Sequence, residues 1–179
     1  MDLNQEWLGS FKAGSKGTFE ELVKETQKMV YSIVFSYVRD REATNDLSQE
    51  TYLRAFESVK LLKDPLKIKS WVCGIARNTA LEWVKKRKNA PRQLQISDNF
   101  EQKQHEVFSY QNSLCKAFQE LRPDEREIIA LRYQQDLSYS QIAEALSMTI
   151  TGVGEKLSRL RKRIGDKVRM LNIDIDEAE

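Results

Sequence analysis

The sequence contains few of the residues from which metal sites, disulfide frameworks and catalytic centres are built. It has two cysteines and one histidine among 179 residues. Cys73, Cys115 and His105 show neither the spacing of a metal-ligand set nor that of a disulfide framework. The sequence also lacks a phosphate-cradling glycine loop and a convincing pair of nucleophile and base. We therefore expect no enzymatic activity, no metal and no cofactor, and interpret these three residues as ordinary ones.

Long apolar segments are also missing. No apolar run approaches the ~20 residues that a membrane-spanning helix needs. The N-terminal residues MDLN lack the basic start and the apolar stretch of a secretory signal. These features predict a cytoplasmic protein without a membrane partner.

Helix-forming residues with helical spacing are abundant, whereas glycine and proline are sparse. Apolar positions recur every three or four residues, and no convincing stretch alternates with period two. We therefore expect an all-α protein. The predicted helices cover roughly residues 3–13, 18–39, 41–59, 68–88, 113–121, 123–135 and 138–146, with a last helix starting near Thr149 or Thr151.

Local signals mark several helix ends. Thr18 and Glu21 have the spacing of a capping box for the second helix, and Asp40 is placed to cap the third. Pro65 interrupts the pattern before the fourth helix. On that helix Trp71, Ile75, Thr79 and Trp83 lie four residues apart, which predicts an apolar stripe. We interpret the two tryptophans as core residues in preference to a platform on which bases stack.

A change of composition divides the chain. Between residues 89 and 111 the helical periodicity weakens and polar residues accumulate around Pro91, as in a tether. The sequence therefore predicts two small helical domains joined by a flexible linker. The expected ranges are 1–90 for the first domain, 91–111 for the linker, 112–172 for the second domain and 173–179 for an acidic tail.

Positive charge is concentrated in two places, although the formal net charge is only +2. One block is Lys85-Lys86-Arg87-Lys88. In the other, residues 156–169 contain seven basic residues and one acid. Clustered basic side chains favour contacts with a polyanion, so their placement is more informative than their sum.

The second basic cluster follows a segment with the form of a helix-turn-helix. Ser138 and Gln141 have the spacing of a capping box, and Ile142, Ala143 and Leu146 form the predicted inner face. The next helix would then present its first turns to a major groove, while its later basic residues meet phosphates. The alternative for this segment alone is an amphipathic hairpin with a solvated basic face.

Three segments together resemble the bacterial sigma factors of the extracytoplasmic-function type. Residues 120–133 (ELRPDEREIIALRY), followed by LSYSQIAEAL, look like the sigma domain that reads the minus-thirty-five element. Residues 46–56 (DLSQETYLRAF) are similar to the segment that docks on the polymerase clamp helices. Residues 71–78 (WVCGIARN) and the basic block after them resemble the segment that reads and melts the minus-ten element.

The resemblance implies a role for each segment. The residues expected to bind core polymerase are Asp46, Gln49, Glu50, Tyr52 and Arg54. Those expected to contact minus-ten DNA are Arg77, Asn78, Lys85, Lys86 and Arg87. The helix-turn-helix would contribute Ser138, Thr151, Lys156, Arg159, Arg161, Lys162 and Arg163.

The implied function is that of an alternative sigma factor, which takes core RNA polymerase to promoters and helps to melt them. Its implied partners are the clamp helices and flap of the polymerase, and double- and single-stranded promoter DNA. An anti-sigma factor is a further candidate partner, and no small-molecule substrate is expected.

Two other functions stay open at this stage. One is a stand-alone helix-turn-helix regulator, which LuxR-type proteins exemplify and which would need a palindromic site and self-association. The other is an interaction module without DNA binding, favoured by Gly152 and Gly154 where the sigma family usually has side chains that touch DNA. Because glycine disfavours helix, we also expect the first turn of the last helix to be loosely formed.

Overall fold

The computed structural model describes residues 4–89 and 116–176, and every regular element within these ranges is helical. In chain order the elements are α1 (Gln5–Lys12), α2 (Lys16–Val38), α3 (Arg41–Ser58), η1 (Val59–Leu61), η2 (Pro65–Lys67), α4 (Ile68–Asn89), α6 (Pro123–Ile129), η3 (Ala130–Gln134), α7 (Tyr139–Leu146) and α8 (Ile150–Asp176). Residues 116–119 form a further helical turn before α6. The predicted all-α fold is confirmed. None of the helices described is long and apolar enough to cross a membrane.

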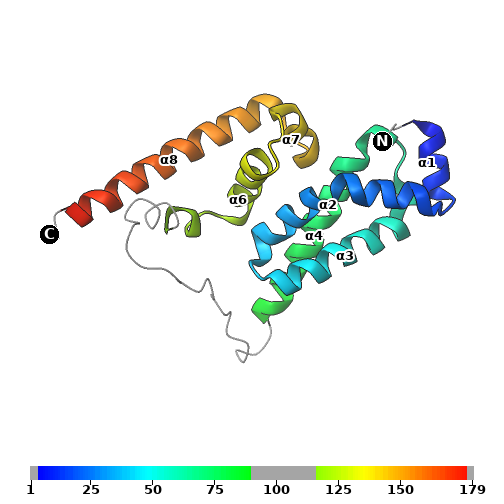
Figure 1. Ribbon diagram of the computed structural model, residues 1–179, viewed down its shortest axis with the longest axis horizontal. Coiled ribbons are helices and arrows are strands. Elements are labelled where there is room, and N and C mark those ends of the chain that lie inside the picture. The colour runs from blue at the N-terminus through cyan, green and yellow to red at the C-terminus, as the bar shows by residue number, and fades with distance from the viewer. Residues whose placement is uncertain (1–3, 90–115, 177–179) are drawn as a thin grey trace.

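The N-terminal elements form a bundle in which α2, α3 and α4 pack against one another, while α1 lies at one end of α2 (Figure 1). Its interior contains fully buried side chains, among them Leu22, Ile33, Ile68 and Val72. One polar pair is buried with them: the hydroxyls of Thr26 and Tyr52 are 2.9 Å apart. This bundle gives α3 and α4 a rigid support for the faces that point outward.

Helix starts agree with the sequence at α3 but not at α2. The Asp40 carboxylate accepts a hydrogen bond from the Ala43 amide at 2.9 Å, so the predicted cap of α3 is confirmed. The capping box expected at Thr18 is wrong, because α2 already begins at Lys16. The Thr18 hydroxyl instead donates to the Ser15 carbonyl at 2.9 Å.

The buried face of α4 overlaps the predicted apolar stripe, of which Thr79 is buried, but its centre is not at the tryptophans. Val72, Ala76 and Ala80 are fully buried, whereas Trp71 and Trp83 are only partly so. Small alanines let α2 and α3 approach α4 closely, and bulky indoles then lie at the edge of the contact. The expectation that both tryptophans belong first to the core is therefore only partly correct.

The C-terminal elements build the expected helix-turn-helix from α7 and α8. The Gln141 amide donates to the Ser138 hydroxyl, and the Gln141 side chain accepts from the Ser138 amide at 2.8 Å, which confirms the capping box. Ser147, in the left-handed conformation at φ 53°, ends α7 and turns the chain toward α8. A long straight α8 follows, drawn in orange and red in Figure 1.

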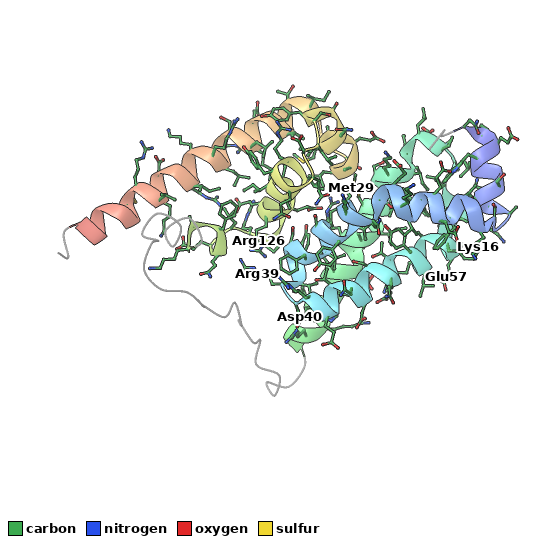
Figure 2. All side chains as sticks on the ribbon, viewed as in Figure 1. Lys16, Met29, Arg39, Asp40, Glu57 and Arg126 are labelled. Carbon is green, nitrogen blue, oxygen red and sulfur yellow. The ribbon has the colours of Figure 1, made fainter. Side chains whose placement is uncertain are left out.

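The two helical units pack against each other. Helix α7 contacts α4, and both α6 and η3 contact α2 (Figure 1). At the edge of this contact Arg126 donates to the Ser36 carbonyl at 2.9 Å, and Arg126 and Arg39 lie close together in Figure 2. The predicted linker, residues 91–111, lies outside the described residues, so its boundaries stay a prediction.

Candidate polymerase and nucleic-acid interfaces

Helix α3 presents a polar outer face with an apolar centre. Asp46 and Gln49 are exposed on this face, and Glu50 is half-buried beside them. Leu53, one further turn along, is 63% exposed in the middle of the same face, and Phe56 is 45% exposed at its edge. Exposed apolar side chains framed by polar ones are typical of a protein-protein contact.

Arg54, at the margin of this outer face, is held in place by two carboxylates. Its guanidinium contacts Glu50 at 2.6 Å and Glu82 of α4 at 2.9 Å. The pair with Glu82 bridges α3 to α4, whereas the pair with Glu50 lies within α3. Four of the five residues predicted to bind polymerase are therefore on or beside one exposed face.

Tyr52 does not belong to that face, so its side chain is not available there for the contact predicted with polymerase. The side chain is 8% exposed, and its hydroxyl lies against Thr26 in the bundle interior. Burial raises the pKa of Tyr52 to about 12. The residue is three positions from Gln49, but its side chain points toward α2. There it packs in the bundle interior beneath the outer face of α3.

The basic residues of α4 divide into two groups. Asn78, Lys85 and Lys86 are exposed and available for contacts. Arg87 lies over the Trp83 ring, 4.8 Å from its centroid, as a cation-π pair. The exposed lysines and the stacked arginine share one end of α4, where a separated DNA strand could follow them.

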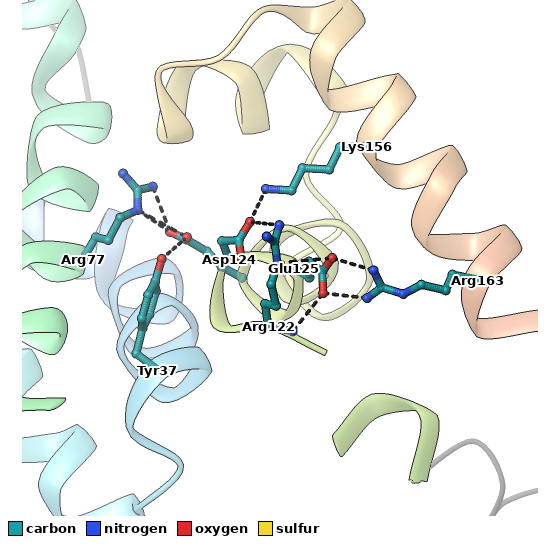
Figure 3. A network of polar contacts seen from close by, with 8 residues as sticks. Tyr37, Arg77, Arg122, Asp124, Glu125, Lys156 and Arg163 are labelled. Carbon is teal, nitrogen blue, oxygen red and sulfur yellow. Dashed lines mark hydrogen bonds and ion pairs between the residues drawn. The ribbon is translucent and has the colours of Figure 1, made fainter. Parts of the chain in front are cut away.

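Arg77, in contrast, is engaged by the other helical unit. Its guanidinium contacts the Glu127 carboxylate of α6 at 2.9 Å, and the Tyr37 hydroxyl of α2 donates to the same carboxylate at 2.9 Å (Figure 3). Glu127 is 2% exposed. Burial, reinforced by the charge of Glu127, raises the pKa of Tyr37 well above its ordinary value. The Arg77 side chain retains 27% exposure.

Sequence reasoning missed Glu127 and Tyr37. Each residue lies in an amphipathic helix where a carboxylate or a phenol is common, and Glu127 is separated from Arg77 by 50 positions and from Tyr37 by 90. The pairing depends on how the two units pack, and no local pattern encodes that packing.

The basic residues of α8 are of two kinds. Arg159, Arg161 and Lys162 are exposed, and so is Thr151, the uncharged member of the predicted set. Three other cations form ion pairs with the acidic start of the C-terminal unit: Lys156 with Asp124 at 2.8 Å, Arg163 with Glu125 at 2.6 Å and Lys167 with Glu120 at 3.1 Å. Figure 3 shows Lys156 and Arg163 reaching from α8 to these carboxylates.

The contacts of Glu125 show that the ion-paired cations of α8 stabilise the fold. The residue is 4% exposed and accepts two hydrogen bonds from Arg163 and one from the Arg122 amide. The hydrogen bonds from Arg163 lower the pKa of Glu125 to about 2. Arg163 therefore fastens α8 to α6, and the DNA contacts predicted for it and for Lys156 would compete with internal pairs.

The two glycines of α8 have structural reasons to be there. The Thr149 hydroxyl accepts a hydrogen bond from the Gly152 amide at 3.0 Å, and a Cβ at position 152 would lie only 2.9 Å from that hydroxyl. A Cβ at Gly154 would contact the Tyr139 ring at 3.6 Å. The expected loose first turn is wrong, because α8 is helical from Ile150 and the Thr149 hydroxyl accepts a hydrogen bond from its first turn.

Among the residues described, no group of three or more histidines, cysteines or acids could hold a metal. Burial raises the pKa of the Cys73 thiol to about 12, which leaves it unreactive at neutral pH. Cys115 and His105 lie outside the described residues. The geometry thus defines a class: a helical protein with a helix-turn-helix, exposed basic surfaces and a separate face for a protein partner.

Comparison with known proteins agrees with that class. Residues 22–90 match the family model for Sigma-70 region 2, and residues 112–164 match that for Sigma-70, region 4. The chain is 26% identical to the ECF RNA polymerase sigma factor SigM of Bacillus subtilis, over 82% of this chain and 93% of SigM. It is 25% identical to the probable RNA polymerase sigma factor RfaY of Xanthomonas campestris, over 87% of this chain but only 42% of RfaY.

A solved structure has the same fold. The sigma factor RpoE of Bartonella quintana, determined in complex with the anti-sigma factor NepR, superimposes with a TM-score of 0.60 at 21% identity, over 84% of this chain and 96% of RpoE. The chain belongs to the sigma-70 family and is an alternative sigma factor of the extracytoplasmic-function type. A stand-alone helix-turn-helix regulator is not favoured, because residues 22–90 match a sigma region.

Proposed function

We propose that the outer face of α3 docks on the clamp helices of core RNA polymerase, that the basic end of α4 engages promoter DNA as its strands separate, and that α8 binds upstream duplex DNA. The chain would act in the cytoplasm, where it would catalyse no reaction of its own. An anti-sigma factor is a candidate partner, as RpoE has in its solved complex.

The observation that carries the docking proposal is the contrast between the two sides of α3. Leu47, Thr51 and Ala55 on the inner side are buried in the bundle. On the outer side Leu53 is 63% exposed, with Asp46 and Gln49 exposed next to it. A partner that covers Leu53 would remove apolar area from water, while the polar residues fix its orientation.

Reversing the charge of the outer face should weaken docking. We expect the variant Asp46→Lys with Gln49→Ala to bind core polymerase roughly tenfold more weakly, because it removes two directional polar contacts. Both side chains are exposed, so the far-ultraviolet circular dichroism should not change. Titration of core polymerase with labelled chain measures the affinity.

The matched control is Glu20→Lys with Gln27→Ala, which makes the same change of charge at exposed positions of α2. This control should bind as the parent does. Equal affinity of the α3 variant and the parent would show that the polymerase docks elsewhere.

The basic end of α4 should contribute more to melting than to capture. We expect Lys85→Ala with Lys86→Ala to reduce open-complex formation several-fold, because the exposed lysines follow a strand backbone that is accessible only after separation. A premelted template should restore part of the loss. Permanganate footprinting of thymines measures opening, and Lys24→Ala with Lys28→Ala on α2 removes the same charge elsewhere. Parent-level opening on duplex template would mean that this end of α4 is only solvated.

A further inference from the structure

The contact between the two helical units contains a carboxylate that takes its hydrogen bonds from the opposite unit. Glu127 lies in α6, yet it accepts three hydrogen bonds from Arg77 of α4 and one from Tyr37 of α2. Figure 3 shows Tyr37 and Arg77 converging on this carboxylate from the N-terminal side. The neighbouring Glu125 is paired within the C-terminal unit instead, to Arg163.

This difference matters because a buried carboxylate is strongly unfavourable unless it is paired and hydrogen-bonded. Glu125 keeps its partner whether or not the units touch. Glu127 has its compensation only while the units are packed together, and it regains water when they separate. An ion pair of this kind holds two bodies in one orientation and can still be broken reversibly.

Three further hydrogen bonds surround the pair. Arg126 donates to the Ser36 carbonyl, Gln135 to the Ser32 hydroxyl at 2.9 Å, and Arg39 to the Gln119 carbonyl at 3.3 Å. They come from residues on both sides of the contact. In addition, α7 packs on α4, the helix that carries Arg77. The packed arrangement is therefore a specific one, with directional bonds along its length.

The packed arrangement occupies a residue that the proposed function needs. Arg77 is bound through its guanidinium by the C-terminal unit, while Lys85 and Lys86 on the same helix are exposed. The same guanidinium edge cannot bind Glu127 and a phosphate at once. The outer face of α3 is unaffected, because Asp46, Gln49 and Leu53 stay exposed.

We propose that Glu127 is an intramolecular clasp, which holds Arg77 and keeps the two units closed on each other until DNA or polymerase separates them. The closed chain can present α3 to the polymerase, but it withholds Arg77 from DNA. The functional consequence of freeing Arg77 rests on the proposed function, in which this residue contacts promoter DNA. Opening itself does not depend on that role and can be measured separately.

The test compares the full-length parent with Glu127→Gln, which preserves shape and removes charge. Small-angle X-ray scattering should show the radius of gyration of the variant rising by roughly a tenth or more above that of the closed chain. The control Glu125→Gln removes a buried charge two residues away, but it disturbs only a pair within one unit, so it should stay compact. Circular dichroism reports whether each variant keeps its helices.

A charge swap distinguishes loss of the ion pair from misfolding of a single variant. Arg77→Glu alone should open the chain, and Arg77→Glu combined with Glu127→Arg should close it again. An unchanged radius of gyration in both Glu127→Gln and Arg77→Glu would overturn the clasp.

A binding measurement then separates the clasp from the proposed function. If the closed form outnumbers the open one ten to one, Glu127→Gln should bind a mixed-sequence single-stranded oligonucleotide roughly tenfold more tightly. Adding Arg77→Ala should cancel that gain. A chain that expands in scattering but gains no affinity would confirm the clasp and contradict the role of Arg77 at DNA.

Discussion

Leu53→Asp should lower the affinity of the chain for core polymerase about 30-fold or more, which corresponds to ~2 kcal/mol, the loss typical of an interface hot spot. The side chain is 63% exposed at the centre of the α3 outer face, so a charged group there meets water in the free chain and an apolar partner surface in the complex. The free energy of unfolding should change little, because Leu53 is not part of the core.

The control for this variant is Met170→Asp on α8. Met170 is 64% exposed, which matches Leu53, but it lies far along the C-terminal unit. Both proteins are titrated against core polymerase by fluorescence anisotropy. If Leu53→Asp and Met170→Asp bind equally well, the apolar centre of α3 does not enter the interface.

The second large effect is expected on α8. Replacing Arg159, Arg161 and Lys162 by alanine should reduce affinity for random-sequence duplex DNA by roughly two orders of magnitude near 100 mM salt. The slope of log K against log salt should become shallower by between about two and three, because each phosphate that a cation neutralises releases about 0.9 counterions. These three side chains are exposed, whereas Lys156 and Arg163 are already paired with acids.

The matched variant replaces Lys16, Lys24 and Lys28 on α2 by alanine, which removes the same charge from another exposed surface. Its salt slope should equal that of the parent. A triple α8 variant with an unchanged slope would place the DNA on some other surface of the chain.

Much of this architecture could be predicted from local signals. The Asp40 cap, the Ser138 capping box and the break at Pro65 are encoded by neighbouring residues, and the structure contains each of them. The helix-turn-helix was also predictable, because its inner residues Ile142 and Leu146 are spaced as a buried face requires.

Features that depend on packing were not predictable in the same way. Tyr52 looked like part of the docking motif, but the helix turns it into the core beside Thr26. Gly152 and Gly154 looked like gaps in a DNA-contacting turn. In the folded protein the Gly152 amide donates to the capping Thr149 hydroxyl, and Gly154 faces the Tyr139 ring. The direction of a side chain within a motif is decided by neighbours that lie far away in the sequence.

The ion pairs show the same division. Seven basic residues near the C-terminus indicated a DNA surface, yet Lys156, Arg163 and Lys167 are bound to acids of the C-terminal unit. Composition revealed the charge but not which part of it is already neutralised. Only the three-dimensional arrangement distinguishes the cations that pair with these acids from Arg159, Arg161 and Lys162, for which the described residues provide no ion pair.

The most direct test of the assignment as a sigma factor is to measure whether transcription by core polymerase depends on this chain. Purified chain is added to bacterial core polymerase with genomic DNA, and the 5′ ends of the transcripts are mapped. We predict a limited set of start sites that share upstream sequence elements and disappear when the chain is omitted or when Leu53→Asp replaces it. Start sites that are the same with and without the chain would contradict the assignment.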